Sequence, residues 1–288
     1  MKRTADERGL STFLGLLEQG TPRWAVLEAL FDSAEYRRLR NECTPLDVLH
    51  ALRCQLVRQL PAAEVIVDLG GAAGSSIEGA LLLMGYPHAP REITIIDLPP
   101  DSRMFADGFA CIHQETTEWL VFGPTRVRYL HQSMSDLSGI ADASVDLVWS
   151  GESIEHITQA EAGEMFQEVW RVLKPGGYFC LDTPNRAITQ IQSPSQLIHP
   201  EHKLEYTASQ LTRCLSEARF QIVQAGGLGP MPKTAQSGVF NWPELTESAD
   251  LSDHAEICYL LYVKCRKPDL PALPASRRDS ALPCPSME

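Results

Sequence analysis

A run of β-branched residues that breaks into glycines constrains the fold of this chain more than any other feature. Val65, Ile66 and Val67 form a continuous apolar run, which suits a parallel strand covered on both faces. The next residues read Asp68-Leu-Gly-Gly-Ala-Ala-Gly74, and their glycines let the backbone turn sharply and approach a ligand closely. A helix starting near Ser75 would aim its N-terminal amides at that ligand. The stretch therefore predicts a strand–turn–helix unit with a ligand at the turn.

From about residue 64 to residue 184 the sequence alternates between strand-like and helix-like segments, the pattern of a doubly wound α/β domain. Capping boxes at Thr158-x-x-Glu161 and Thr207-x-x-Gln210 predict two helix starts. With two later strands at 220–223 and 257–263, we predict a Rossmann-like sheet of seven mostly parallel strands. The strands expected earlier are 64–69, 92–97, 127–131, 144–149 and 176–182, and the helices expected between them are 75–85, 105–120 and 158–173.

The chain divides into three regions by composition. Residues 1–61 show helical patterns without a convincing strand and predict an N-terminal helical extension or cap, with a homodimer contact as one use for it. Residues 62–266 form the predicted main domain. Residues 267–288 contain five prolines among Ser and Arg residues, which predicts a disordered tail.

Charge and cysteine usage narrow the class of protein. The net charge of −12 argues against binding to nucleic acid or to an anionic membrane, since both need a basic surface. The eight cysteines include no C-x-x-C pair, and several lie in apolar runs, as reduced core residues do. No apolar stretch approaches the ~20 residues that cross a bilayer. These features predict a cytoplasmic protein that binds neither nucleic acid nor membrane.

The order of motifs between residues 64 and 184 resembles that of class I S-adenosylmethionine-dependent methyltransferases. The frame Asp68-x-Gly70-x-Ala72-x-Gly74 is similar to the first motif of the family, with Ala72 where a glycine usually stands. Asp97 follows at the end of the second expected strand, and Leu173-Lys-Pro-Gly-Gly177 matches the turn into the fifth strand of the family. The resemblance implies S-adenosyl-L-methionine as cofactor and methyl transfer as activity.

The resemblance also implies roles at the cofactor site. Asp97, with Leu98 beside it, is expected to accept the ribose hydroxyls. The family usually places an acid at the position of Ser133 to bind the adenine amino group, so either Ser133 or Asp136 makes that contact, or the adenine contact is weak. Met134 is expected to form an apolar wall against the adenine ring. The predicted cofactor-binding residues are Asp68, Gly70, Gly71, Ala72, Gly74, Asp97, Leu98, Ser133, Met134 and Ser150.

The segment after the fourth expected strand reads Glu152-Ser-Ile-Glu155-His156 and carries the candidate catalytic group. An alcohol acceptor must lose a proton, and a well-placed base accelerates that step by about 10²–10⁴-fold. His156 is the predicted base, because histidine titrates near neutral pH and this loop is expected to face the transferred methyl group. Glu152 and Glu155 are lesser candidates. The alternative is that His156 is part of the loop architecture only.

A second polar segment, residues 199–207, precedes the helix capped by Thr207. In related enzymes this region overhangs the acceptor, so His199, His202 and Tyr206 are predicted to bind substrate. The alternative is that these residues only form hydrogen bonds within the loop. Two histidines three residues apart, with carboxylates nearby, could also hold a divalent metal. No third ligand is recognisable in the sequence, so no metal site is predicted.

Together these features predict methyl transfer from S-adenosyl-L-methionine to a small-molecule or glycan-linked acceptor, at oxygen. Ser150-Gly-Glu-Ser153 stands where nucleic-acid amino-methyltransferases carry an Asn/Asp-Pro-Pro-aromatic motif, which argues against a nucleic-acid substrate. A nicotinamide-dependent oxidoreductase on a similar sheet is one alternative. The other is a non-catalytic binding protein that keeps the fold, and the departures at Ala72 and Ser133 leave it open.

Overall fold

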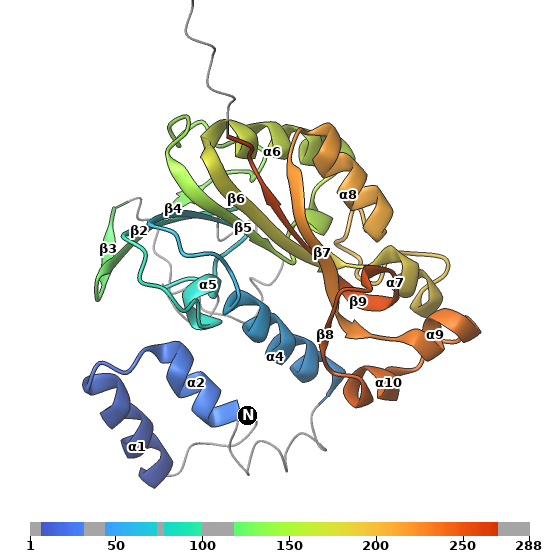
Figure 1. Ribbon diagram of the computed structural model, residues 1–288, viewed down its shortest axis with the longest axis horizontal. Helices are drawn as coiled ribbons and strands as arrows, with labels where there is room; N and C mark the ends of the chain where they lie inside the picture. Colours follow the sequence, from blue (N-terminus) through green and yellow to red (C-terminus); the bar gives the residue numbers. More distant parts are fainter. Residues whose placement is uncertain (1–6, 32–43, 74–77, 100–117, 270–288) are drawn as a thin grey trace, which may run out of the picture.

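The computed structural model describes residues 7–31, 44–73, 78–99 and 118–269. Its centre is a nine-stranded sheet in the order β3-β4-β2-β1-β5-β6-β9-β7-β8 (Figure 1). Strands β4, β2, β1, β5 and β6 run parallel to one another, while β3, β9, β7 and β8 each pair antiparallel with a neighbour. The strands are β1 Val65–Leu69, β2 Glu92–Asp97, β3 Leu120–Phe122, β4 Thr125–His131, β5 Val145–Gly151, β6 Leu173–Pro184, β7 Gln221–Pro230, β8 Leu251–Ser252 and β9 Cys258–Arg266.

The α/β class and the mostly parallel core are confirmed, but the predicted number of seven strands is wrong. The two additional strands, β3 and β8, are three and two residues long and lie at opposite edges of the sheet. Strands this short carry too few residues for an alternating apolar pattern, and edge strands are often kept short. All five strands expected between residues 64 and 184 are present, within a few residues of the expected bounds.

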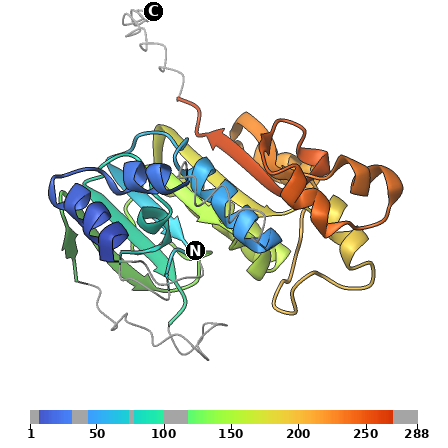
Figure 2. The same ribbon diagram turned by 90° about the horizontal axis from the view of Figure 1, so that it is seen from below.

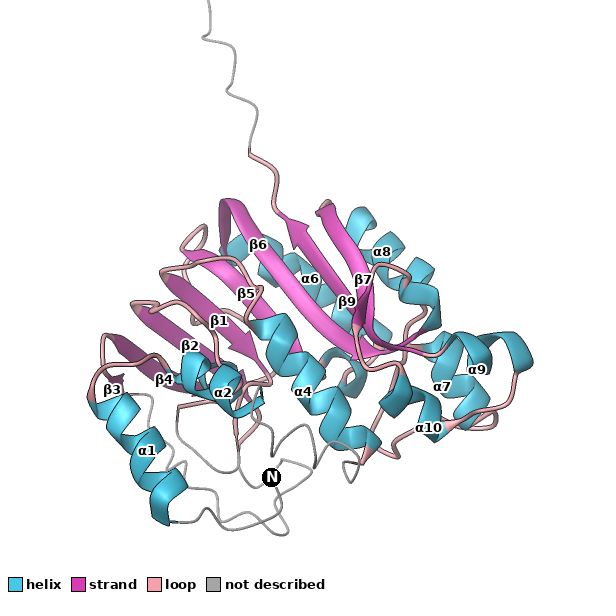
Figure 3. Cartoon of the chain, turned by 60° about the horizontal axis from the view of Figure 1, so that its bottom comes forward, coloured by secondary structure: helices cyan, strands magenta, loops and turns pink. Residues whose placement is uncertain are grey.

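Helices cover both faces of the sheet. Figure 3 shows α4 on one face and α6 on the other. The helices are α1 Glu7–Glu18, α2 Arg23–Phe31, α4 Pro45–Val57, α5 Ala80–Leu83, α6 Gln159–Val172, α7 Arg186–Gln192, α8 Ala208–Glu217, α9 Pro232–Ser237 and α10 Trp242–Glu247, with 3-10 turns η3 Ile154–His156 and η4 Ala255–Ile257. Capping boxes begin α4, α6 and α8 at Thr44, Thr158 and Thr207, which confirms the two helix starts predicted at Thr158 and Thr207.

The alternation of side chains along the strands divides the core into two clusters. Val67 and Leu69 of β1 pack with the buried face of α6, whereas Ile66, which precedes Val67, packs with α4 and α5. This period of two is what a strand covered on both faces requires. Each cluster contributes to holding the carboxyl ends of β1, β2 and β5 at one edge of the parallel sheet.

Two expected helices differ from the structure where it describes them. The helix expected over 75–85 begins only at Ala80, because Gly79 has φ +84°, which lies outside the helical region. Residues 74–77 lie outside the described residues. The predicted end of the helix over 105–120 is wrong, because Leu120 is the first residue of β3. Residues 100–117 lie outside the described part of the chain.

The N-terminal region contributes to the core through α4. Its residues Leu52 and Leu56 pack in the same cluster as Ile66 of β1. Helices α1 and α2 contact each other, and Figure 2 shows them at one end of the sheet. Three further statements stay predictions: the domain boundary at residue 61, the homodimer contact and the disordered tail. Residues 270–288 of that tail lie outside the described residues. Within the described residues, no helix is both long and apolar enough to cross a membrane.

Candidate active site

The turn after β1 is folded around a buried carboxylate. Asp68 is 1% exposed, and a Cβ atom added to Gly71 would lie 2.1 Å from its Oδ2 atom, so only glycine fits at that position. Burial raises the pKa of Asp68 to about 8, although a hydrogen bond from the backbone of Leu81 opposes the shift. Among the described residues, Oδ2 of Asp68 has no hydrogen-bond partner. The turn therefore holds a polar atom that a ligand could satisfy.

The same turn contacts the loop that follows β5. Gly70 has φ +73° and donates its N–H to the carbonyl of Ile96, at 2.8 Å. A Cβ atom on Gly70 would lie 2.6 Å from Cβ of Ser153. The Ser153 hydroxyl donates to the carbonyl of Leu69 at 3.0 Å and pairs with the hydroxyl of Ser150 at 2.8 Å. Ser150 is fully buried, so the structure gives it a part in joining β1 to this loop.

Asp97, at the end of β2, lies beside the turn. Its Oδ2 accepts from the N–H of Ala72 at 3.0 Å, and its Oδ1 accepts from the N–H of Leu98 at 2.8 Å. Because β1 and β2 are parallel neighbours, their carboxyl ends meet at one edge of the sheet. The structure thus brings Asp97, Ala72 and Leu98 together, and the side chain of Leu98 is exposed.

The two residues predicted to face an adenine ring differ in their surroundings. The Ser133 hydroxyl lies 2.9 Å from that of Ser135 and accepts from the Ser135 N–H at 3.2 Å, a contact within its own turn. The Cε atom of Met134 lies 4.0 Å from the position of a Cβ on Gly70, so the fold brings Met134 to the glycine turn. Gly74, the last residue of the predicted motif, lies outside the described residues.

A pocket of about 640 Å³ lies next to the loop after β5. Its walls are mainly apolar and come from the start of α4, the end of β6, the segment 192–202, α10 and β9. The polar side chains in the wall include Glu152, His199 and His202. The lining residues are Thr44, Pro45, Leu46, Leu49, Glu152, Pro184, Gln192, Ile198, His199, His202, Trp242 and Tyr259.

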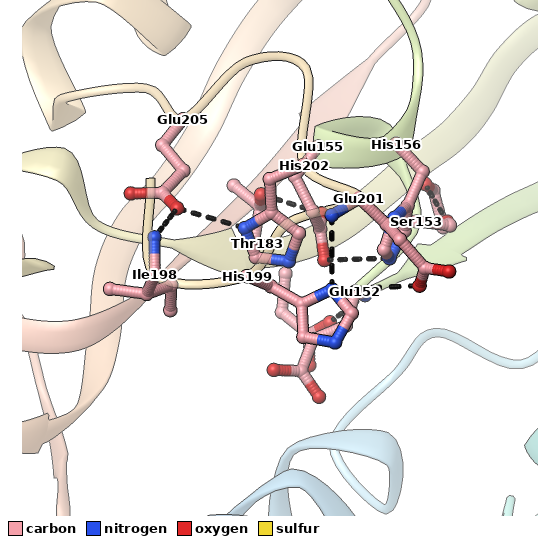
Figure 4. A network of polar contacts seen from close by, with 12 residues as sticks. Glu152, Ser153, Glu155, His156, Thr183, Ile198, His199, Glu201, His202 and Glu205 are labelled. Atoms are coloured by element: carbon pink, nitrogen blue, oxygen red, sulfur yellow. Dashed lines mark hydrogen bonds and ion pairs between the residues drawn. The ribbon is translucent and has the colours of Figure 1, made fainter. Parts of the chain in front are cut away.

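Three histidine rings gather beside this pocket (Figure 4). The ring centroid of His156 lies 5.0 Å from that of His202 and 6.4 Å from that of His199, and the His199 and His202 centroids are 5.4 Å apart. His156 belongs to η3, whereas the other two belong to the loop after α7. Burial, together with the nearby His202 and His199, lowers the pKa of His156, which favours a neutral imidazole.

His202 is oriented by a buried carboxylate, Glu205. Nδ1 of His202 lies 2.8 Å from Oε1 of Glu205, which also accepts from the N–H of Ile198 at 2.9 Å. The other carboxylate oxygen accepts from the hydroxyl of Thr189. Burial opposes ionisation of Glu205, but the hydrogen bonds from His202 and Thr189 prevail and lower its pKa. With Nδ1 occupied, Nε2 is the His202 nitrogen that faces the histidine cluster (Figure 4).

A second buried carboxylate, Glu155, lies between the histidines. The Thr183 hydroxyl donates to its Oε2 at 2.8 Å, and its Oε1 lies 4.0 Å from Nε2 of His156. Burial and the neighbouring Glu152 raise the pKa of Glu155 to about 8. One ligand atom each from Glu155, His156 and His202 lies within 4.8 Å of the others.

Arg53 of α4 is a site residue that sequence reasoning missed. Its Nε donates to Oδ2 of Asp182 at 2.7 Å, and its Nη1 lies 2.8 Å from Oε2 of Glu152. Asp182 also accepts from the N–H of Glu152 at 2.7 Å, which holds Glu152 at φ +46°. Arg53 and Asp182 therefore fix Glu152 in the pocket wall. The only sign of this ion pair in the sequence is the acid Asp182 within the apolar run of β6.

The structure does not bring every predicted substrate residue to the pocket. His199 and His202 line it. Tyr206 is 4% exposed and packs in the core, where its carbonyl accepts from the N–H of Arg186 at 2.8 Å. Trp242 and Tyr259 contribute two aromatic walls to the pocket.

Comparison with known proteins gives consistent matches. A family model described as "Methyltransferase domain" matches residues 67–181. A protein of Mycolicibacterium smegmatis named "Probable S-adenosylmethionine-dependent methyltransferase" is 36% identical over 103 residues, which cover 36% of this chain and 38% of that protein. The dimethylglycine N-methyltransferase of Parasynechococcus marenigrum is 30% identical over 139 residues, covering 48% of this chain and 44% of the enzyme. The chain thus spans less than half the length of these relatives.

The fold is also found among solved structures. A chain from the complex between the Haloferax volcanii Trm112 methyltransferase activator and a methyltransferase superposes with a TM-score of 0.53. The match covers 79% of this chain and 92% of that one, at 16% sequence identity. At that identity the similarity concerns the fold alone.

Proposed function

We propose that this chain, which belongs to the class I S-adenosylmethionine-dependent methyltransferases, transfers a methyl group to a hydroxyl of a small acceptor held beside His202. The main support for this proposal is the position of the loop after β5, between the glycine turn and the pocket. Ser153 of this loop contacts Gly70 of the glycine turn, and Glu152 next to it lines the pocket. The loop therefore connects the turn expected to hold the methyl donor with the pocket proposed for the acceptor.

The residues at the ends of β1 and β2 fit the cofactor of this family, S-adenosyl-L-methionine. Asp97 would accept the ribose hydroxyls, and the buried Asp68, whose Oδ2 lacks a hydrogen-bond partner among the described residues, supplies a further polar group under the turn. Gly70 and Gly71 have no room for a side chain, as a close backbone approach requires. When bound, the cofactor supplies a methyl group from its sulfonium sulfur, and the rest of the cofactor leaves as a neutral thioether.

The pocket fits a small acceptor or the end of a glycan-linked one. Its volume of about 640 Å³ lies within the usual range of about 300–1,000 Å³ for small-molecule sites. The apolar walls, including Leu49 and Trp242, would bury the body of the acceptor, and the histidines at one end would meet a polar group. The net charge of −12 agrees with an acceptor other than a nucleic acid.

An acceptor hydroxyl needs a proton acceptor, and the histidine cluster is placed to provide one. His202 lines the pocket and is oriented through Nδ1 by Glu205, which leaves Nε2 to accept a proton. His156, the base predicted from the sequence, does not line the pocket but packs 5.0 Å behind His202, centroid to centroid. We assign the direct contact to His202 and keep His156 as the neighbouring neutral base.

Methyl transfer to an amine is the second candidate. Trp242 and Tyr259 line the pocket, and with Phe240 they form a group of three rings with centroids 4.9–6.1 Å apart. Aromatic faces together with the carboxylate of Glu152 favour a cationic ligand such as an ammonium group. The relative named for N-methylation of dimethylglycine points the same way. The atom that carries the new methyl group in the product distinguishes the two candidates.

Calorimetry with S-adenosylhomocysteine tests the cofactor site. We expect binding to the wild-type chain and at least about a tenfold weaker Kd for Asp97→Ala, since one lost hydrogen bond to a charged group costs about 1.5–3 kcal/mol. Asp250→Ala is the matched control, because Asp250 likewise accepts from the next N–H, that of Leu251, at 2.8 Å. No binding at millimolar ligand would refute the proposal. Cofactor binding without transfer to any acceptor would instead favour a non-catalytic protein.

A further inference from the structure

The cluster of Glu155, His156 and His202 has the composition of a metal site. We propose that these three residues bind one divalent first-row transition-metal ion, and that the ion holds the acceptor hydroxyl. The role of the ion rests on the function proposed above, whereas binding of the ion does not. Of the two histidines singled out in the sequence, His199 and His202, only His202 belongs to this cluster, and η3 supplies Glu155 and His156.

The distances require only a small closure. One ligand atom from each residue already lies within 4.8 Å of the other two, and Nε2 of His156 is 4.0 Å from Oε1 of Glu155. Ligand atoms at about 2.0–2.2 Å from a tetrahedral ion lie roughly 3.4 Å apart. Rotations of the His156 and His202 rings would shorten these distances.

The groups that would orient the ligands are already in place. Glu205 holds Nδ1 of His202 and turns Nε2 toward the cluster, the carboxylate–histidine arrangement common behind metal ligands. Thr183 donates to Oε2 of Glu155 and leaves Oε1 toward His156 (Figure 4). Two of the three ligands thus have a supporting hydrogen bond that selects the atom facing the site.

The charge balance also favours a cation. Glu155 is 1% exposed, and three acids, Glu155, Glu152 and Asp182, gather here with Arg53, which pairs with the last two. A divalent ion would stabilise the ionised carboxylate. Two imidazoles with one carboxylate suit Zn²⁺, Mn²⁺, Fe²⁺ or Co²⁺ better than Mg²⁺, which prefers oxygen ligands.

Three protein ligands leave a coordination position open, as catalytic metal sites do. His202 and Glu152 both line the pocket, so an acceptor there can reach the ion. The ion would lower the pKa of a coordinated hydroxyl, whose proton passes to the carboxylate of Glu152. The oxygen then forms a bond to the methyl carbon, the bond from that carbon to sulfur breaks, and S-adenosylhomocysteine leaves. In this arrangement His202 acts as a ligand instead of a base.

Cobalt titration of the metal-free protein tests the site without any substrate. We expect one Co²⁺ per chain with visible absorption bands of a nitrogen-ligated ion, and the same stoichiometry for Zn²⁺ by calorimetry. Glu155→Gln and His202→Gln should weaken binding by at least about tenfold, since each removes one ligand. His254→Gln is the control, because His254 is exposed and precedes η4. Binding of S-adenosylhomocysteine by each variant verifies that it is folded.

The outcomes separate this inference from the proposed function. No ion bound, or equal binding by wild type, Glu155→Gln and His202→Gln, overturns the metal site whatever the activity. Methyl transfer that is unchanged in metal-free protein overturns the role of the ion and leaves the proposed function intact. An ion bound with no affinity for S-adenosylhomocysteine overturns the proposed function and leaves the metal site intact.

Discussion

Replacing Glu205 with glutamine should destabilise the protein by about 2–3 kcal/mol at pH 7. The carboxylate is fully buried and accepts hydrogen bonds from His202, Ile198 and Thr189, and Nη1 of Arg186 lies 3.4 Å from its Oε2. Glutamine keeps one acceptor oxygen, so its Oε1 can still face His202 and Ile198, while the Thr189 hydroxyl can turn to accept from the amide. Each bond then loses its charged partner and about half its strength, or roughly 1 kcal/mol, which sums to the stated range.

Urea denaturation of wild type and Glu205→Gln measures this difference, with Glu201→Gln as control. Glu201 lies in the same loop, but its carboxylate is partly exposed and lies 3.5 Å from Nδ1 of His199, so we expect a change below about 0.5 kcal/mol. A Glu205→Gln variant as stable as the Glu201→Gln control would refute the network as described.

The stability that Glu205 contributes should also depend on pH. The pKa of Glu205 is lowered in the folded protein from its ordinary value of 4.5, so the folded state favours the ionised form. The resulting stability is fully present above about pH 4.5 and is lost as the pH falls through the lower folded pKa. The difference between wild type and Glu205→Gln should therefore shrink below pH 4.5. A difference that stays constant down to pH 3.5 would contradict this assignment.

Two further predictions concern the elements that support the site. Gly70→Ala should lower the free energy of unfolding, measured by thermal denaturation, by about 2–4 kcal/mol, because φ is +73° and the new Cβ meets Ser153 at 2.6 Å. The control Gly163→Ala, whose Cβ would meet nothing within 4 Å, should leave the stability unchanged or raise it. Arg53→Met should cost about 3–5 kcal/mol by leaving the buried Asp182 carboxylate unpaired, and Arg53→Met combined with Asp182→Asn should restore part of that loss. Equal stability of the single and double variants would contradict the pairing.

The sequence predicted those parts of the fold that local signals specify. The capping boxes at Thr158 and Thr207 fixed two helix starts, because four consecutive residues contain the whole interaction. The β-branched run before Gly70 specified a buried central strand. Strands β3 and β8 were missed because so few residues show no periodicity, and α5 was extended too far because Gly79 gives no sign of its positive φ.

The candidate site was predicted less completely, because its contacts join distant parts of the chain. The pairing of His202 with Glu205 spans three residues and is readable from spacing, and the segment was singled out for its histidines and carboxylates. Arg53 and Asp182 are 129 residues apart, and nothing local relates them. The same holds for Glu155 and His202, which only the fold brings within reach of one ion.

Transfer of an isotopically labelled methyl group tests the central claim most directly. The full chain is incubated with methyl-labelled S-adenosyl-L-methionine and a small-molecule extract of its host, and the labelled product is identified by mass spectrometry and NMR. We expect label in a methyl ether of a small or glycan-linked molecule, at a rate strongly reduced by His202→Gln and unchanged by His254→Gln. No labelled product, or a rate equal in wild type and His202→Gln, would contradict that claim.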